Sequence, residues 1–210
     1  MVSLAALAAG AFPELFLPPH LTAGLNPPPA LGVLLAAQAA FLLIFWPLLA
    51  GLRQGRPWAS HAAATVGEYL LWLAVSAPLY LVAAWLADAT AADVVRGVLY
   101  LSAVAAGAWG LTSWVHAERP VMTPAAVLLA LLAAAGAPVA CYLLIELTDA
   151  AQSVAWLRHA APLTCAFTNA APRVETWHPQ PLWAWGLWPA VGLLAACAAL
   201  LGRSHAESPP

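Results

Sequence analysis

Few side chains in this sequence could do chemistry, and the most conspicuous of them stand inside long apolar runs. Gln38 and Glu68 are polar groups within hydrophobic segments. Such groups are costly in a membrane unless they face protein or water, so they mark a pathway or a contact between helices. For Gln38 we favour an interhelical hydrogen bond over contact with a substrate. For Glu68 we favour a structural role as a first-turn acid at a helix amino terminus, with Arg53 or Arg56 as its partner.

No catalytic constellation accompanies these groups. The sequence contains no G-x-S-x-G, H-E-x-x-H or paired-glutamate motif, and it has no lysine with which to build a P-loop. Ser113 and His116 share a helix face, an arrangement that is usually structural. The cysteines Cys141, Cys165 and Cys197 form no C-x-x-C pair. We therefore expect that this chain is not an enzyme and that it holds no metal or cofactor.

The elements that must position these residues are membrane-spanning helices. Hydrophobic residues make up 63% of the sequence and charged residues 8%, whereas roughly 25% of the residues in an average soluble domain are charged. A helix needs about 20 apolar residues to cross the hydrocarbon core. We predict an all-α membrane protein, one domain over residues 1–210, with six transmembrane helices at about 1–17, 30–51, 66–87, 94–115, 124–147 and 182–202. The first segment contains Pro13 and Glu14, so partial insertion is its alternative.

Arginines at the ends of the predicted spans indicate an orientation. Arg53 and Arg56 follow the second span, Arg119 follows the fourth and Arg203 follows the sixth. Because basic residues concentrate on the cytoplasmic side, six spans with both termini in the cytoplasm satisfy the pattern. We expect a multi-pass protein of the bacterial inner (plasma) membrane. The net charge of −2 and the lack of a basic run exclude a nucleic-acid-binding surface.

The longest connection, residues 148–181, is predicted to lie on the outer side before the last span. It is too charged and interrupted to cross a bilayer, yet too apolar for an ordinary water-facing loop. Pro162 prevents one continuous helix, because proline lacks the amide donor and clashes with the preceding turn. We expect a re-entrant or interfacial elbow of two short helices that includes Arg158, His159, Pro162 and Thr164.

This layout resembles the membrane subunit of type-2 ABC exporters, including relatives of the haem-export subunit of cytochrome c maturation. The segment L-R-H-A-A-P-L-T-C-A-F, from Leu157, is similar to the family's elbow, and E-Y-L-L-W-L-A-V-S-A-P-L-Y, from Glu68, is similar to its third span. The resemblance implies a permease-like subunit that moves or hands over a hydrophobic or amphipathic substrate. It also implies a homodimer or heterodimer of membrane subunits in the bilayer, and a soluble ATPase partner in contact with Arg53, Arg56 and Trp58.

Two further interpretations stay open. The alternative function is a haem- or quinone-binding anchor or structural subunit of a respiratory assembly, since His61 and His116 both lie at predicted cytoplasmic ends of spans. Ser102, Ala106 and Gly110 repeat at four-residue spacing, and small residues so spaced let helices approach closely. We therefore expect a close contact between helices at these residues. That they form a specific interface between two chains is the less favoured interpretation.

Overall fold

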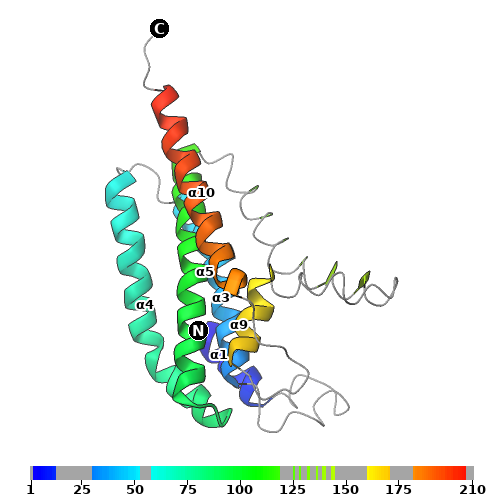
Figure 1. The fold of residues 1–210 in the computed structure, drawn as a ribbon. Helices are drawn as coiled ribbons and strands as arrows, with labels where there is room; N and C mark the ends of the chain where they lie inside the picture. The colour runs from blue at the N-terminus through cyan, green and yellow to red at the C-terminus, as the bar shows by residue number, and fades with distance from the viewer. Residues whose placement is uncertain are drawn as a thin grey trace.

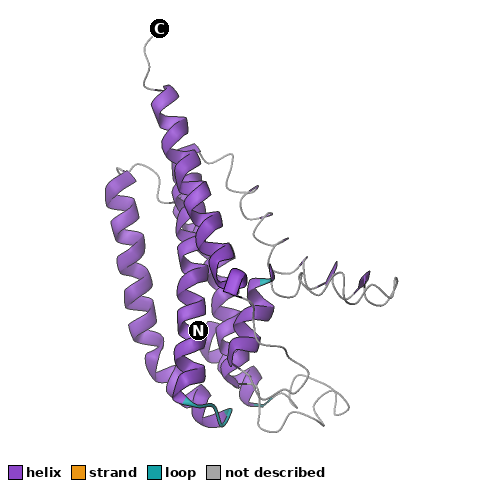
Figure 2. Ribbon diagram, in the orientation of Figure 1, coloured by secondary structure: helices purple, strands orange, loops and turns teal. Residues whose placement is uncertain are grey.

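The computed structural model describes residues 2–12, 30–52, 58–118, 160–170 and 182–206, and single residues between 125 and 144. Helices are the elements within these ranges, and no described residue forms a strand (Figure 2). The all-α class is thereby confirmed for the described part of the chain. The helices are Val2–Ala11 (α1), Ala30–Leu52 (α3), Trp58–Leu86 (α4), Ala91–Glu118 (α5), Pro162–Ala170 (α9) and Leu182–Ala206 (α10).

Four of these helices are long and apolar enough to cross a membrane, over residues 30–49, 63–86, 91–114 and 183–200. They match the second, third, fourth and sixth predicted spans. The helix α1 has ten residues, which is about 15 Å and shorter than the predicted first span. Residues 13–17 of that span lie outside the described residues, as does most of the predicted span at 124–147.

The helix α5 is the centre of the bundle, in contact with α3, α4, α9 and α10 (Figure 1). Contacts along its length give the directions of its neighbours. Leu35 of α3 packs at Gly97 near the start of α5, and Gly192 of α10 packs at Gly110 further on. Gly107 also lies against Trp188, so residue numbers rise together along α5 and α10 and these two helices run parallel. The helix α3 has the same direction, since its later residue Trp46 lines a cavity with Ala105 and Trp109 of α5. The helix α4 runs antiparallel to them, because the short turn at 87–90 joins it to α5.

The turn between α4 and α5 has a defined geometry. Asp88 has a φ of 48°, in the left-handed region that aspartate tolerates better than most residues. Thr90 and Asp93 then form a capping box: the Thr90 N–H and hydroxyl donate to Asp93 Oδ2 at 2.9 and 2.7 Å, and the Asp93 N–H donates to Thr90 Oγ1 at 3.3 Å. Arg96 lies 3.5 Å from the same carboxylate. This network determines where α5 begins.

A very close approach joins α5 to α10. A Cβ atom at Gly110 would collide with the backbone of Gly192, and one at Gly192 would collide with the carbonyl oxygen of Ala106. At Gly107 it would lie 2.8 Å from the carbonyl oxygen of Trp188. Only glycine permits this spacing of the two backbones. The close contact predicted at Ala106 and Gly110 is confirmed, and its partner is a helix of the same chain.

Proline interrupts three of the four long helices. Pro47 lies inside α3, Pro78 inside α4 and Pro189 inside α10. A proline removes one backbone hydrogen bond from a helix and favours a kink. No proline lies inside α5, so the central helix keeps its hydrogen bonds while its neighbours can bend.

Candidate functional site

The helix α4 lies at the edge of the bundle, and its two faces differ (Figure 1). The outer face is apolar and exposed, with Leu70, Leu71, Val75, Leu81, Val82 and Trp85. The face toward the bundle carries hydroxyl groups instead. Thr65, Ser76 and Tyr80 are 4%, 3% and 4% exposed, and Tyr69 packs its ring 6.0 Å from that of Trp46 on α3. These four residues, with Gln38 and Ser102 opposite them, are called the hydroxyl seam below.

Toward the α4–α5 turn, the seam is closed by a hydrogen bond between α3 and α4. The Tyr80 hydroxyl donates to Oε1 of Gln38 at 2.6 Å, and both residues are buried. Ser76 lies one turn away on the same face of α4 and is also buried. The predicted interhelical bond of Gln38 is therefore confirmed. Its amide nitrogen Nε2 is buried with no partner among the described residues.

Further from the turn, the seam joins α4 to α5 through Tyr69 and Ser102, whose hydroxyl oxygens are 2.9 Å apart. Ser102 also donates to the carbonyl oxygen of Val98 at 2.9 Å, inside its own helix. A serine hydroxyl has a single hydrogen. Tyr69 must therefore be the donor in the bond to Ser102, and the Tyr69 oxygen keeps its capacity to accept a hydrogen bond.

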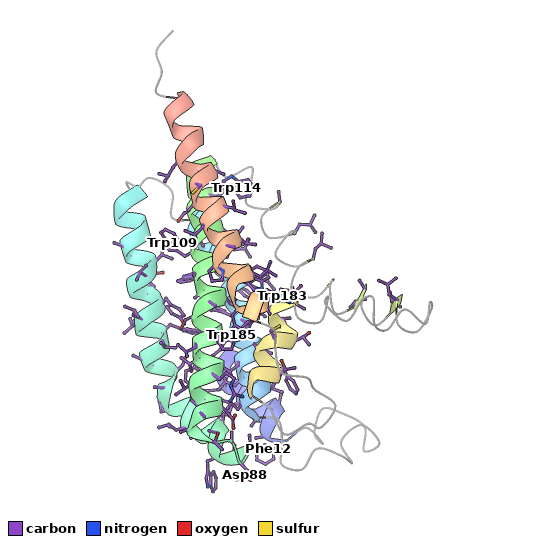
Figure 3. The ribbon with its side chains drawn as sticks, viewed as in Figure 1. Phe12, Asp88, Trp109, Trp114, Trp183 and Trp185 are labelled. Carbon is purple, nitrogen blue, oxygen red and sulfur yellow. The ribbon has the colours of Figure 1, made fainter. Side chains whose placement is uncertain are left out.

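A cavity of about 340 Å³ lies beside this Tyr69–Ser102 pair. This volume falls in the range of small-molecule sites, about 300–1,000 Å³. Its lining comes from α3, α4 and α5 and includes no charged residue: Trp46, Val66, Tyr69, Ser102, Ala105, Ala106 and Trp109. The indole nitrogen of Trp109 is buried with no hydrogen-bond partner in the described part of the chain, and Figure 3 shows Trp109 between α4 and α5. The cavity thus combines aromatic walls with the polar Tyr69–Ser102 pair.

Glu68 stands next to Tyr69 in α4 and is half-buried. The prediction that Glu68 is a first-turn acid is wrong, because α4 begins at Trp58 and Glu68 lies about three turns further on. The cause is the alanine-rich start of α4, which continues the helix beyond the segment that hydropathy alone selects as membrane-spanning.

None of the other predicted site residues that the structure describes lines the cavity. Trp58 is the first residue of α4. The remaining residues of the predicted ATPase contact and of the first part of the predicted elbow lie outside the described residues: Arg53, Arg56, Arg158 and His159.

The described part of the predicted elbow is the helix α9, which contains Pro162 and Thr164. The predicted helix break is present, since α9 begins at Pro162, a position where the missing amide would be unpaired in any case. The helix packs against α3 and α5. A Cβ atom at Gly32 of α3 would lie 2.9 Å from the ring of Phe167, so glycine at this position lets α9 dock closely.

The hydroxyl residues on the inner face of α4 were not among the predicted site residues, although the sequence carries a signal for them. Thr65, Tyr69, Ser76 and Tyr80 follow one another at intervals of four, seven and four residues, which places them on one face of a helix. Their burial on the inner face, opposite an apolar outer face, makes them the main polar feature of the described bundle. Comparison with protein-family models, curated proteins and solved structures finds no match to this chain.

Proposed function

We propose that this chain is a permease-like membrane subunit of an ABC-type exporter that moves or hands over an amphipathic molecule. The hydroxyl seam is the observation that carries the proposal. From Thr65 to Tyr80, α4 rises roughly 22 Å, which is most of the hydrocarbon core of about 30 Å. A row of buried polar groups of this length is costly in a membrane and points to a functional path.

The seam suits an amphipathic molecule that moves along α4. Its hydroxyl groups exchange hydrogen bonds with a polar head, while the tail stays in the surrounding lipid. In α4, 22% of the membrane-length segment is buried, against 50% in α5 and 56% in α3. The share for α10 is 28%, so α4 is the least buried of the four helices, and we take it as the wall that moves. Separation from α3 and α5 breaks the bonds of Tyr80 and Tyr69, each of which contributes about 0.5–1.5 kcal/mol.

The directions of the helices support the six-span layout within this proposal. Since α5 and α10 run parallel, the chain has to return along the bundle between Glu118 and Leu182. A fifth span at 124–147 fits that return. Residues 53–57 join α3 to α4 at the end of the bundle away from the α4–α5 turn, so the positive-inside rule makes that end cytoplasmic. Both termini would then be cytoplasmic, and the elbow at 148–181 would lie on the outer side.

The ATPase partner comes from the family resemblance, and it can be tested directly. The tagged chain is purified from its native membrane in mild detergent, and bound proteins are labelled with a photoreactive ATP analogue. We expect a nucleotide-binding subunit in the complex, and its loss in the variant with Arg53→Ala and Arg56→Ala. The matched control is Arg96→Ala, a cation at the opposite end of the bundle whose partner is Asp93. A stable complex that contains only cytochromes or oxidase subunits would instead support the respiratory anchor.

A further inference from the structure

We infer that the first part of α4, residues 58–77, is a gate that swings about Pro78 and opens the cavity between α3, α4 and α5. These residues are called the α4 arm below. This inference rests on the proposed function and names the part of α4 that moves and the residue about which it moves.

The packing of α4 differs on the two sides of Pro78. Three hydrophobic residues of α4 are buried in the core, Tyr80, Ala83 and Ala84, and all of them follow Pro78. Among the described residues 63–77, no hydrophobic side chain is fully buried, and those that reach the core do so as half-buried side chains. Because burial of apolar surface is the main source of packing stability, the arm is held less firmly than the rest of the helix.

Polar contacts also fix the part of α4 that follows Pro78. The Tyr80 hydroxyl donates to Gln38 of α3 at 2.6 Å. The N–H of Ala89 donates to the carbonyl oxygen of Ala84 at 2.9 Å, where the chain turns into α5. The capping box at the start of α5 follows directly. The helix is thus anchored at the turn, and it diverges from α5 toward Trp58 (Figure 1).

Pro78 has the properties of a hinge between these two parts. It has no N–H to donate to the carbonyl oxygen of Ala74, so the helix lacks one hydrogen bond there, and helices bend at such positions. Val66 lies 12 residues before Pro78, which is about 18 Å along the helix. A change in bend of about 20° at Pro78 therefore moves Val66 by roughly 6 Å.

The cavity lies between this arm and the anchored helices. Val66 and Tyr69, the two residues that α4 contributes to the lining, both precede Pro78, and the other lining residues belong to α3 and α5. The hydrogen bond of 2.9 Å from Tyr69 to Ser102 joins the arm to α5. It acts as a latch, since a movement of several ångströms breaks it and widens the cavity while the Tyr80 bond stays intact.

The direction in which the gate opens agrees with export. The free end of the arm is the end at which residues 53–57 join α3 to α4. In the proposed layout this end is cytoplasmic, which is the side from which an exporter takes its cargo.

Distances between spin labels test the hinge in the full chain, reconstituted in lipid nanodiscs with the native cysteines replaced by alanine. The arm pair carries labels on cysteines that replace Ala63 and Leu194, and the reference pair carries them in place of Leu81 and Leu194. All three positions are exposed. We expect a narrow distribution for the reference pair. For the arm pair we expect a broad or two-peaked distribution, with positions up to roughly 8 Å apart for a 20° bend.

Two substitutions act on the hinge and on the latch. Pro78→Ala restores the missing hydrogen bond, so the distribution of the arm pair should narrow toward that of the reference pair. Val82→Ala is the matched control, because Val82 lies one turn further on the same exposed face and keeps its backbone hydrogen bond; both distributions should stay unchanged. Tyr69→Phe removes the latch and should raise the ratio of long to short arm distances about twofold to tenfold.

Equal widths for the arm pair and the reference pair would overturn the inference. An arm pair that is as broad in Pro78→Ala as in Val82→Ala would do the same. These outcomes are distinguishable from the failure of the proposed function. A moving arm in a chain that has no ATPase partner keeps the hinge and removes the exporter, whereas an ATPase partner together with a rigid arm does the reverse.

Discussion

The contact between α5 and α10 makes a quantitative prediction for Gly192→Ala. The added methyl group would collide with the carbonyl oxygen of Ala106 and would lie 2.9 Å from the Cα atom of Gly107. The two helices have to separate to relieve this contact, and overpacking of this kind costs about 1–3 kcal/mol. Gly186→Ala is a matched control on the same helix, since nothing lies within 4 Å of a Cβ atom there. Both variants gain the helix propensity of alanine, about 1 kcal/mol, so their difference isolates the collision.

The free energy of unfolding can be measured by titration of the purified protein with sodium dodecyl sulfate, followed by circular dichroism. We expect Gly192→Ala to be about 1–3 kcal/mol less stable than Gly186→Ala. The melting temperature should fall by about 2–4 °C for each of these kcal/mol in a chain of this size. Size-exclusion chromatography in parallel reports the oligomeric state.

Equal stability of the two variants would refute the close packing of α5 on α10. A change in oligomeric state without a change in stability would show that the glycine surface acts between chains. In that case the small-residue repeat of α5 would form an interface between two chains, which is the less favoured interpretation of the sequence. Either outcome would also remove the argument that α10 runs parallel to α5.

Three further outcomes test other parts of the fold. Tyr80→Phe leaves the buried amide oxygen of Gln38 without a donor and should lower the free energy of unfolding by about 1–2 kcal/mol. A double-mutant cycle with Gln38→Leu measures the coupling between the two residues, and purely additive losses would argue against the bond. Thr90→Ala removes the amino-terminal cap of α5 and should cost about 0.5–2 kcal/mol, with faster hydrogen exchange in the first turn of α5 as the local readout. Cys165 is buried and Cys197 is exposed, so N-ethylmaleimide should modify Cys197 much faster than Cys165. Mass spectrometry measures the rate at each cysteine, and equal rates in the folded protein would show that α9 is not docked.

Hydropathy predicted the long helices well because each membrane-length apolar run in the described residues forms one helix. It misplaced the start of α4, since hydropathy measures suitability for lipid and not the extent of a helix. The start of α5 can be located in the sequence by its amino-terminal cap. The sequence from Thr90 to Asp93 fits the capping-box pattern, and that pattern, rather than hydropathy, locates the first turn of the helix.

The candidate site was predictable only in part. A glutamine in an apolar helix has to find a partner, so an interhelical bond for Gln38 followed from its type and position. The identity of that partner, Tyr80, depends on how α3 and α4 pack, which local sequence does not contain. The cavity beside Trp109 depends on three helices at once. The spacing of small residues in α5 predicted a close contact but could not choose between a helix of the same chain and one of another.

The pairing of Gly110 with Gly192 has a consequence for biosynthesis. Gly192 follows Gly110 by 82 residues, so the ribosome completes α5 long before it produces the partner helix. Until α10 enters the bilayer, the glycine surface of the nascent chain lacks this partner. The contact between α5 and α10 therefore forms only after α10 has been made and inserted, and a chain that stops before residue 182 exposes an unfilled groove to membrane quality control.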